Sequence, residues 1–315
     1  MYKILVTGGA GFIGSNLVAA LLQDQRVQLV RVLDNLATGF MKNIEEFNGH
    51  PKFEFFEGDI RDYETCVKAT QGIHLISHQA ALGSVPRSIK DPITTNAVNI
   101  EGTLHIFNAA VENKVKRVVF AASSSTYGDS EGLPKVEDVI GKPLSPYAVT
   151  KYVNELYADV FARTYDFEYI GLRYFNVYGP KQDPNGAYAA VIPLFFKAAI
   201  EGKGPIINGD GNNSRDFTYV ENAVEANILG LFTDNQDAIN QVYNIACGER
   251  TTLNELWQLI KSVTNCAADA THGPNRSGDI PHSLASIEKA KNLLGYSGKV
   301  KLKEGLEKAL KFYKD

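Results

Sequence analysis

The sequence is poor in several features that would each define a class of protein. Among its 315 residues are only three cysteines, Cys66, Cys247 and Cys266, and they are far apart. Few cysteines in an odd number favour a reducing compartment without structural disulfides. No apolar run reaches the roughly 18 residues of a membrane span, and MYKILVTGG at the start lacks a signal-peptide cleavage site. We therefore expect a cytoplasmic protein without a membrane partner.

The charge pattern is also unremarkable. The formal net charge is −4, and Lys and Arg do not gather into the basic patch that nucleic-acid binding requires. A hydrophobic content of 44% and a charged content of 22% are ordinary for a soluble globular protein. The chain is long enough for a large buried core, and no repeat or linker interrupts it. We expect a globular protein that binds no nucleic acid.

Strand and helix patterns alternate through the first part of the chain. Strands are predicted at 3–7, 27–35, 53–62, 72–81, 116–125 and 168–177, and helices at 63–70, 93–113 and 146–165. Such alternation is typical of α/β proteins with a doubly wound parallel sheet of the Rossmann type. We predict that this domain covers 1–177.

From about residue 178, loops rich in Gly, Asn, Asp and Pro become frequent. Helices are predicted at 189–201, 220–232 and 251–263, a strand at 242–246, and amphipathic helices after Ser286. We predict a smaller α/β substrate-binding domain over 178–315. It is interleaved with the first domain, to which segments at about 215–247 return.

A glycine-rich turn, TGGAGFIGS, joins the first strand to a helix and contains Gly8, Gly11 and Gly14. Glycines there permit a tight turn and close approach of a pyrophosphate to the helix N-terminus. Asp34 ends the next strand, 20 residues after Gly14, where a carboxylate can bind a ribose diol and repel a 2′-phosphate. This context predicts binding of NAD. Asp59, ending the third strand, lies where an adenine ring is expected, or else caps the next helix.

The segment SPYAVTK, residues 145–151, predicts a helix that begins with an N-cap, Ser145, followed by Pro146. Tyr147 and Lys151, four residues apart, then share one face. They form either a surface pair or a phenol activated by an ammonium. At about 4 Å and an effective dielectric near 20, the ammonium would contribute roughly 4 kcal/mol, about three pKa units. Tyr147 would then act as a base near neutral pH.

Ser123 lies near the end of the strand predicted at 116–125, 24 residues before Tyr147, and completes a recognisable set. Ser followed by Tyr-x-x-x-Lys, behind the glycine-rich turn, resembles the extended short-chain dehydrogenase/reductase family over essentially the whole chain. The blocks LRYFNVYGP, NGDGNNSRDFTYVEN and RSGDIPHS resemble the nucleotide-sugar branch of that family. HQAALGSVPRS, ASSSTYGD and KQDPNGAYAAVIP resemble bacterial UDP-N-acetylglucosamine 4-epimerases most.

The resemblance implies an NAD-dependent 4-epimerase acting through a transient 4-keto sugar, with Ser123, Tyr147 and Lys151 catalytic and no metal. It implies cofactor contacts from Gly8, Gly11, Phe12, Ile13, Gly14, Asp34, Asn35, Thr38, Gly39, Asp59, Ile60, Gln79, Ala80, Ala81, Asn99, Tyr147, Lys151 and Tyr174. It implies contacts to a UDP-sugar from Gly83, Ser84, Ser123, Ser124, Ser125, Tyr147, Asn176, Ala190, Val191, Ile206, Asn208, Arg215, Arg276, Asp279 and Ser283. The helices 93–113 and 150–165 would form a four-helix interface in a homodimer.

Small differences within the family separate its reactions. Ser124 and Ser125 stand where dehydratases carry an Asp-Glu pair, so dehydration is disfavoured. A small residue at Ser283 implies room for an N-acetyl group, which favours UDP-GlcNAc and UDP-GalNAc, although Ser283 could instead cap the following helix. UDP-glucose with UDP-galactose, or N-acetylhexosaminuronic acids, remain alternative substrates. A non-catalytic NAD- and UDP-sugar-binding regulator is the alternative of a different class.

Overall fold

The computed structural model describes residues 1–184, 189–274 and 280–314. Its centre is a seven-stranded sheet in the order β11-β6-β5-β4-β1-β2-β3, with every pairing parallel. The strands are β1 (Tyr2–Thr7), β2 (Val27–Asp34), β3 (Phe53–Glu57), β4 (Leu75–His78), β5 (Arg117–Ser123), β6 (Glu168–Tyr174) and β11 (Gln241–Ile245). The chain winds outward from β1 to β3 and then, from β4, the other way. The predicted doubly wound parallel sheet is therefore confirmed, and the reversal places a crevice at the strand ends between β1 and β4.

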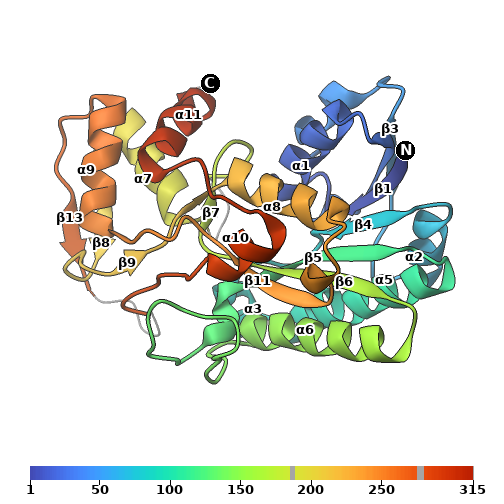
Figure 1. The fold of residues 1–315 in the computed structure, drawn as a ribbon. Coiled ribbons are helices and arrows are strands. Elements are labelled where there is room, and N and C mark those ends of the chain that lie inside the picture. The colour runs from blue at the N-terminus through green and yellow to red at the C-terminus, as the bar shows by residue number, and fades with distance from the viewer. Residues whose placement is uncertain (185–188, 275–279, 315) are drawn as a thin grey trace.

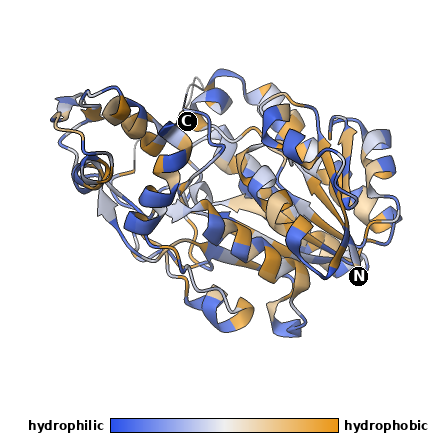
Figure 2. Cartoon of the chain, turned by 90° about the horizontal axis from the view of Figure 1, so that it is seen from above, coloured by the Kyte–Doolittle hydropathy of each residue, from blue (hydrophilic) through white to orange (hydrophobic). Residues whose placement is uncertain are grey.

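Helices cover both faces of this sheet (Figure 1). On one face lie α1 (Phe12–Gln23) and α8 (Val220–Phe232), which contact each other, and on the other lie α2 (Tyr63–Thr70), α5 (Gly102–Glu112) and α6 (Pro146–Thr164). Each face has its own apolar core. Leu17, Leu21 and Ala223 belong to the first core, and Phe107 and Phe161 belong to the second. Viewed from above, the strands are mostly apolar and the outer loops mostly polar (Figure 2).

The helix predicted over 93–113 is confirmed as an uninterrupted helical run that contains one π-helical turn. After α3 (Val85–Lys90), the chain forms α4 (Pro92–Asn96), one wide π-helical turn (Ala97–Glu101) and then α5. The strands predicted at 53–62 and 72–81 are shorter in the structure. There, β3 ends at Glu57 and β4 ends at His78. The residues that follow these strands are loops at the mouth of the crevice. Short 3₁₀ turns lie at Met41–Asn43, Glu45–Phe47, Ser124–Tyr127 and Gln236–Ala238.

The C-terminal part has short strands and packed helices, at the left of Figure 1. Three two-stranded sheets pair β7 (Val177–Tyr178) with β10 (Thr218–Tyr219), β9 (Ser214–Arg215) with β12 (Thr251–Thr252), and β8 (Ile206–Asn208) with β13 (Thr271–Gly273). The helices are α7 (Val191–Ile200), α9 (Leu253–Thr264), α10 (Glu288–Leu294) and α11 (Leu302–Lys314). In the described ranges no helix has both the length and the apolar character to cross a membrane.

Candidate active site

A cavity of about 620 Å³ opens at the carboxyl ends of the central strands. Residues expected to contact NAD that line it are Gly8, Gly11, Phe12, Ile13, Gly14, Asp34, Asn35, Thr38, Gly39, Asp59, Ile60, Gln79, Ala80, Ala81, Tyr147, Lys151 and Tyr174. Residues expected to contact the sugar that line it are Gly83, Ser123, Ser124, Tyr147 and Asn176. The cavity thus brings the glycine-rich turn and the Ser-Tyr-Lys set together.

The glycine-rich turn leaves no room for side chains at two of its positions. Gly8 has φ +67°, and a Cβ there would lie 2.7 Å from the amide nitrogen of Ala80. A Cβ on Gly14 would meet the carbonyl oxygen of Gly8 at 2.1 Å. Gly11 precedes α1 and offers no side-chain cap, so N–H groups of the first turn face the cavity mouth without a side-chain acceptor. This cradle fits a dinucleotide pyrophosphate.

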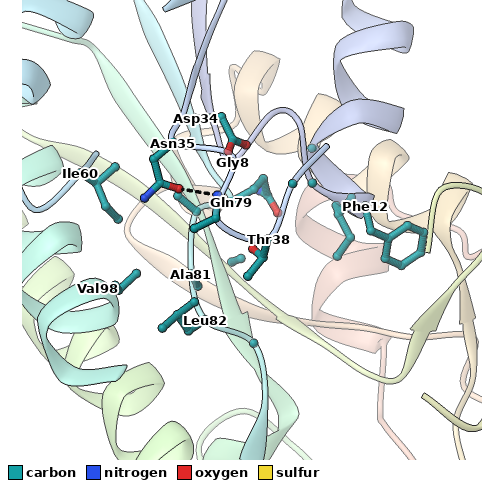
Figure 3. Close-up of a pocket in the computed structure, with 18 of the residues that line it drawn as sticks. Gly8, Phe12, Asp34, Asn35, Thr38, Ile60, Gln79, Ala81, Leu82 and Val98 are labelled. Carbon is teal, nitrogen blue, oxygen red and sulfur yellow. Dashed lines mark hydrogen bonds between the residues drawn. The ribbon is translucent and has the colours of Figure 1, made fainter. Parts of the chain in front are cut away.

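Asp34, at the end of β2, lies beside Gly8 of the glycine-rich turn (Figure 3). Its carboxylate accepts hydrogen bonds from the amides of Ala10 at 2.9 Å and Leu36 at 2.8 Å. Burial raises the pKa of Asp34, and the two amide hydrogen bonds offset part of that rise. Each carboxylate oxygen has a further lone pair, so Asp34 can still accept a hydrogen bond from a ribose hydroxyl.

Asp59 is held at the cavity edge by Arg61 and Asn35. The Arg61 guanidinium donates to it at 2.6 to 3.1 Å, and the Asn35 amide nitrogen donates at 2.8 Å. The hydrogen bonds from Arg61 lower the pKa of Asp59 to about 2. The alternative that Asp59 caps the next helix is wrong, because Asp62 is the N-cap of α2.

Several cavity residues were not predicted. Arg61, Leu82, Thr94, Val98 and Val177 also line the cavity. Figure 3 shows Ile60, Val98 and Leu82 on the side opposite Phe12. The sequence contains a local signal for Arg61, because its position two residues after Asp59 favours contact with that carboxylate. Val98 had none, because its direction depends on the π-helical turn between α4 and α5.

The start of α6 positions Tyr147 and Lys151 as the sequence predicts. Ser145 caps the helix by accepting from the Ala148 amide at 3.2 Å, and Pro146 occupies the first turn. Ser123 and Tyr147 both line the cavity, and Ser123 is near enough to lower the pKa of Tyr147. The Lys151 ammonium donates to the carbonyl of Ala121 on β5 at 2.7 Å. A tyrosine, a serine and a buried lysine therefore meet at the inner end of the cavity, which excludes the surface-pair alternative.

The expected effect of Lys151 on Tyr147 is wrong for the protein alone. Burial raises the pKa of Tyr147 overall, and the interaction with Ser123 offsets that rise in part. Burial also lowers the pKa of Lys151, to about 8. The Coulomb argument from the sequence counted only the attraction between the Tyr147 phenolate and the Lys151 ammonium. It neglected desolvation, which disfavours both charged forms. A further positive charge at the cavity would lower the pKa of Tyr147.

Three other predicted residues lie beside the cavity without lining it. Asn99 is buried, accepts from the Leu82 amide at 2.8 Å and donates to Thr150 at 3.1 Å, so it fixes the loop after β4. Ser84 caps α3 through the Arg87 amide at 3.2 Å. Ser125 donates to the Ser123 hydroxyl at 2.8 Å and so orients a residue of the site. Their direct contacts to cofactor or sugar stay predictions.

The residues expected to bind the nucleotide of the substrate are more scattered. Asn176 lines the cavity with φ +33° and donates to the Asp216 carbonyl at 3.0 Å. The remaining residues that the structure describes do not line the cavity: Ala190, Val191, Ile206, Asn208, Arg215 and Ser283. Arg276 and Asp279 lie outside the described residues.

Two of these residues have informative local surroundings. The Arg215 guanidinium donates to the carbonyls of Ser214 and Pro281, which ties β9 to the segment before Ser283. Ser283 is half-buried, and its amide donates to the Ser214 carbonyl at 3.0 Å. The alternative that Ser283 caps a helix is wrong, because α10 begins at Glu288 with Ile287 at the cap.

The two histidines near β4 have structural partners. His78 is buried between Thr7, at 2.7 Å, and Thr103, at 3.0 Å, and burial lowers its pKa to about 3. His74 accepts from the Lys3 amide at 2.9 Å. Across the described part of the chain, no three His, Cys, Asp or Glu side chains are grouped as metal ligands would be.

The fold and the cavity define a dinucleotide-binding α/β enzyme with a Ser-Tyr-Lys set. Residues 4–246 match the model of the NAD dependent epimerase/dehydratase family. A putative UDP-glucose 4-epimerase of Methanocaldococcus jannaschii is 38% identical over 99% of this chain and 98% of its own length. The chain belongs to the NAD dependent epimerase/dehydratase family, and its cofactor is NAD.

Two solved structures are close to this fold. UDP-glucose 4-epimerase of Thermotoga maritima, in complex with UDP-glucose, has a TM-score of 0.92 and 36% identity, covering 99% of this chain and 98% of that one. UDP-N-acetylglucosamine 4-epimerase of Methanobrevibacter ruminantium, in complex with UDP-N-acetylmuramic acid, has a TM-score of 0.92 and 38% identity, with the same coverage. Both similarities extend over the C-terminal part as well as the central sheet.

Proposed function

We propose that this protein is a 4-epimerase that interconverts UDP-GlcNAc and UDP-GalNAc. The observation that carries the epimerase assignment is the convergence of Ser123, Tyr147 and Lys151 on the cavity formed by the glycine-rich turn. A base, a hydroxyl that can bridge to the reacting oxygen, and a buried cation are the protein groups suited to oxidising a sugar hydroxyl when NAD accepts the hydride. Ser124 and Ser125 supply no additional acid or base for dehydration.

The residues of the site divide the chemistry among them. When bound, NAD would supply a reversible hydride acceptor and a positive charge that favours the Tyr147 phenolate. Tyr147 would remove the proton from the 4-hydroxyl while the hydrogen on C4 leaves as hydride to the acceptor. The two losses together give a 4-keto sugar, and Tyr147 would later return the proton. Ser123 holds the reacting oxygen, and Lys151 keeps positive charge beside the phenol and binds the nicotinamide ribose. Inversion requires that the keto sugar turn over within the cavity before the proton and hydride return.

The nucleotide must stay bound while the sugar turns. Arginine is suited to a diphosphate because its donors form a planar fork. We assign Arg215 and Arg276 to the diphosphate, Ile206 and Asn208 to the uracil, and Asp279 to the uridine ribose. Gly83, Ser84, Asn176, Ala190 and Val191 are assigned to the sugar and the adjoining phosphate.

The preference for N-acetylated sugars rests on Ser283. In the resemblance set out above, a small side chain at this position leaves room for an N-acetyl group. The 38% identity to a protein named UDP-N-acetylglucosamine 4-epimerase supports this choice. UDP-glucose and UDP-galactose are the second candidate pair, which the names of the Methanocaldococcus and Thermotoga proteins favour.

Separate incubations with the four UDP-sugars test both candidates. Purified protein is mixed with UDP-GlcNAc, UDP-GalNAc, UDP-glucose or UDP-galactose, and the products are resolved by anion-exchange chromatography. We expect UDP-GlcNAc and UDP-GalNAc to be interconverted. UDP-glucose and UDP-galactose should be interconverted with a lower kcat/KM or not at all. Faster conversion of the plain hexoses would reject the Ser283 argument and keep the epimerase. No conversion of any of the four would leave N-acetylhexosaminuronic acids to test, and then the regulator.

We also propose a homodimer formed through α4, α5 and α6. Ile93 on α4 is 81% exposed, and Val149, Leu156 and Val160 are exposed along one face of α6, which packs beside α4. An apolar stripe of this kind is unusual on a monomer. Sedimentation analysis should give twice the chain mass for the wild type and a monomer for Leu156→Glu. A monomeric wild type at micromolar concentration would reject the dimer.

A further inference from the structure

A buried ion pair lies directly behind the Ser-Tyr-Lys set. The Arg173 guanidinium donates to both carboxylate oxygens of Glu155, with its Nε at 2.9 Å and Nη2 at 2.7 Å. The side chains are 3% and 6% exposed, and neither belongs to the cavity lining. They therefore touch neither cofactor nor sugar directly.

The pair is attached to the elements that carry the site. Glu155 follows Lys151 by one turn of α6, and Arg173 lies on β6 beside Ala122 of β5, next to the cavity residue Tyr174. Arg173 also donates to the carbonyl of Glu137 at 2.8 Å. These contacts fix the carboxylate of Glu155 on the side of Arg173, one helical turn from the lysine.

Burying such a pair is costly, so stability is a weak explanation for it. Desolvation of two charges often equals or exceeds their attraction, and apolar replacements are frequently neutral. The neighbouring Lys151 is a third buried charge, 4% exposed, with one carbonyl acceptor. Burial lowers the pKa of Lys151, and the negative charge of Glu155 raises it in part.

The other titratable groups near Lys151 do not supply a negative charge. His78 faces it from β4 and is neutral, because burial holds its pKa near 3. Tyr147 lies on the same helix, and Tyr174 on β6; burial raises the pKa of both. Arg173 is positive. In the part of the chain that the structure describes, Glu155 is the carboxylate whose charge acts on Lys151.

We propose that Glu155, held in place by Arg173, is a positioning residue that keeps Lys151 protonated while Tyr147 works as the base. This inference rests on the proposed epimerase function. Without the carboxylate, Lys151 would be buried near an uncompensated Arg173 cation and would lose its proton at lower pH. Tyr147 would then lose the neighbouring positive charge that favours its phenolate, while substrate binding would be little affected.

The same sheet contains a matched control pair. Arg117 and Glu168 form a second ion pair, with Arg117 Nη2 2.7 Å from Glu168 Oε2 and Arg117 1% exposed. These residues are paired in register at the first positions of β5 and β6, which are the strand ends away from the cavity. Glu168→Gln therefore disrupts a comparable Arg-carboxylate pair far from the reacting groups.

The test compares wild type, Glu155→Gln, Glu155→Asp and Glu168→Gln by the pH dependence of kcat. For Glu155→Gln we expect the alkaline limb to move down by about one pH unit or more, within the range that a neighbouring charge shifts a pKa. KM should change less than about twofold. Glu155→Asp should restore most of the wild-type profile, and Glu168→Gln should keep the wild-type limb even if less stable.

A direct titration of Lys151 provides a readout independent of turnover. Protein labelled with ¹³C at lysine Cε is titrated by NMR, with the Lys151 signal assigned from Lys151→Arg. The Lys151 pKa should fall in Glu155→Gln and stay unchanged in Glu168→Gln. If Glu155→Gln does not fold, the apolar double variant Glu155→Met/Arg173→Met replaces it, and a downward shift is again expected.

The outcomes separate this inference from the epimerase assignment. An unchanged Lys151 pKa and alkaline limb in Glu155→Gln, or an equal shift in Glu168→Gln, would overturn the role of Glu155 in an active enzyme. Inactivity of the wild type on every UDP-sugar would reject the epimerase instead, whatever the NMR titration gives.

Discussion

The two parts of the molecule are built from elements of very different length. In the central sheet, β1, β2, β5 and β6 run for six to eight residues and end at one cavity. In the C-terminal part, β8 has three residues and β9 has two, and Ile206 on β8 is 72% exposed. Long parallel strands bring distant residues to one edge whatever the loops do. Short strands leave the position of binding groups to loops, which a ligand can rearrange.

The largest expected effect is on kcat, and it tests this comparison at the inner end of the cavity. Tyr147→Phe removes the proton acceptor and leaves the ring in place, so kcat should fall about 10³-fold, within the range of general acid–base catalysis. NAD binding, measured by absorbance of the purified protein, should remain. Because the site is preformed by the sheet, no substitution in the C-terminal part should reduce kcat as far.

Tyr165→Phe is the matched control, since Tyr165 follows the same helix and is exposed. Its kcat should equal that of the wild type. Residual activity of Tyr147→Phe above about a tenth of wild type would assign the base to another group.

The next largest effect concerns the glycine-rich turn. In Gly14→Ala the new Cβ would meet the Gly8 carbonyl at 2.1 Å, so the turn must shift. We expect a loss of about 1–3 kcal/mol in the free energy of unfolding, as overpacking typically costs, together with loss of bound NAD. Denaturant unfolding and NAD titration measure the two effects.

Gly132→Ala is its control, because no heavy atom lies within 4 Å of the added Cβ. It should change the free energy of unfolding by less than about 0.5 kcal/mol. A Gly14→Ala protein that retains NAD and full stability would show that the cradle is not tight.

The same contrast explains which parts were predictable. Gly8 follows β1, Asp34 and Ser123 end β2 and β5, and Tyr147 opens α6, so local strand and helix patterns and the motif resemblance were enough to predict their roles. The direction of the Tyr147 pKa shift was wrong, because burial cannot be counted from two residues four apart. The three short sheets, the π-helical turn and the partners of Asn99 depend on contacts between distant segments. No local pattern in the sequence encodes them.

Buried ionisable groups in the two parts should give pH dependences of opposite sign. Burial lowers the pKa of His78 in the sheet to about 3, so its contribution to stability is lost as pH falls below about 6.5. Burial raises the pKa of Asp216 in the C-terminal part to about 7, so its contribution is lost as pH rises toward 7. The pH dependence of the free energy of unfolding of the whole protein combines both contributions. Substituting one of the two residues isolates the contribution of that residue.

We therefore expect the stability advantage of wild type over His78→Gln to shrink by about 2 kcal/mol between pH 7.5 and pH 5. Urea unfolding at the two pH values measures it. The exposed His272 supplies the control, and wild type minus His272→Gln should stay constant within about 0.5 kcal/mol. A constant difference for His78→Gln would mean that this histidine is not held neutral by burial.

The smallest effect tests the C-terminal part, where position depends on loops. Ser283→Tyr fills the space that we assign to the N-acetyl group, so the ratio of kcat/KM for UDP-GlcNAc to that for UDP-glucose should fall about tenfold, as for modest pocket changes. Ser262→Tyr, on the exposed face of α9, should leave the ratio unchanged. Equal ratios in all three proteins would mean that Ser283 stays away from the sugar even in the complex. The C-terminal part would then discriminate through other residues, whereas the chemistry of the sheet would be unaffected.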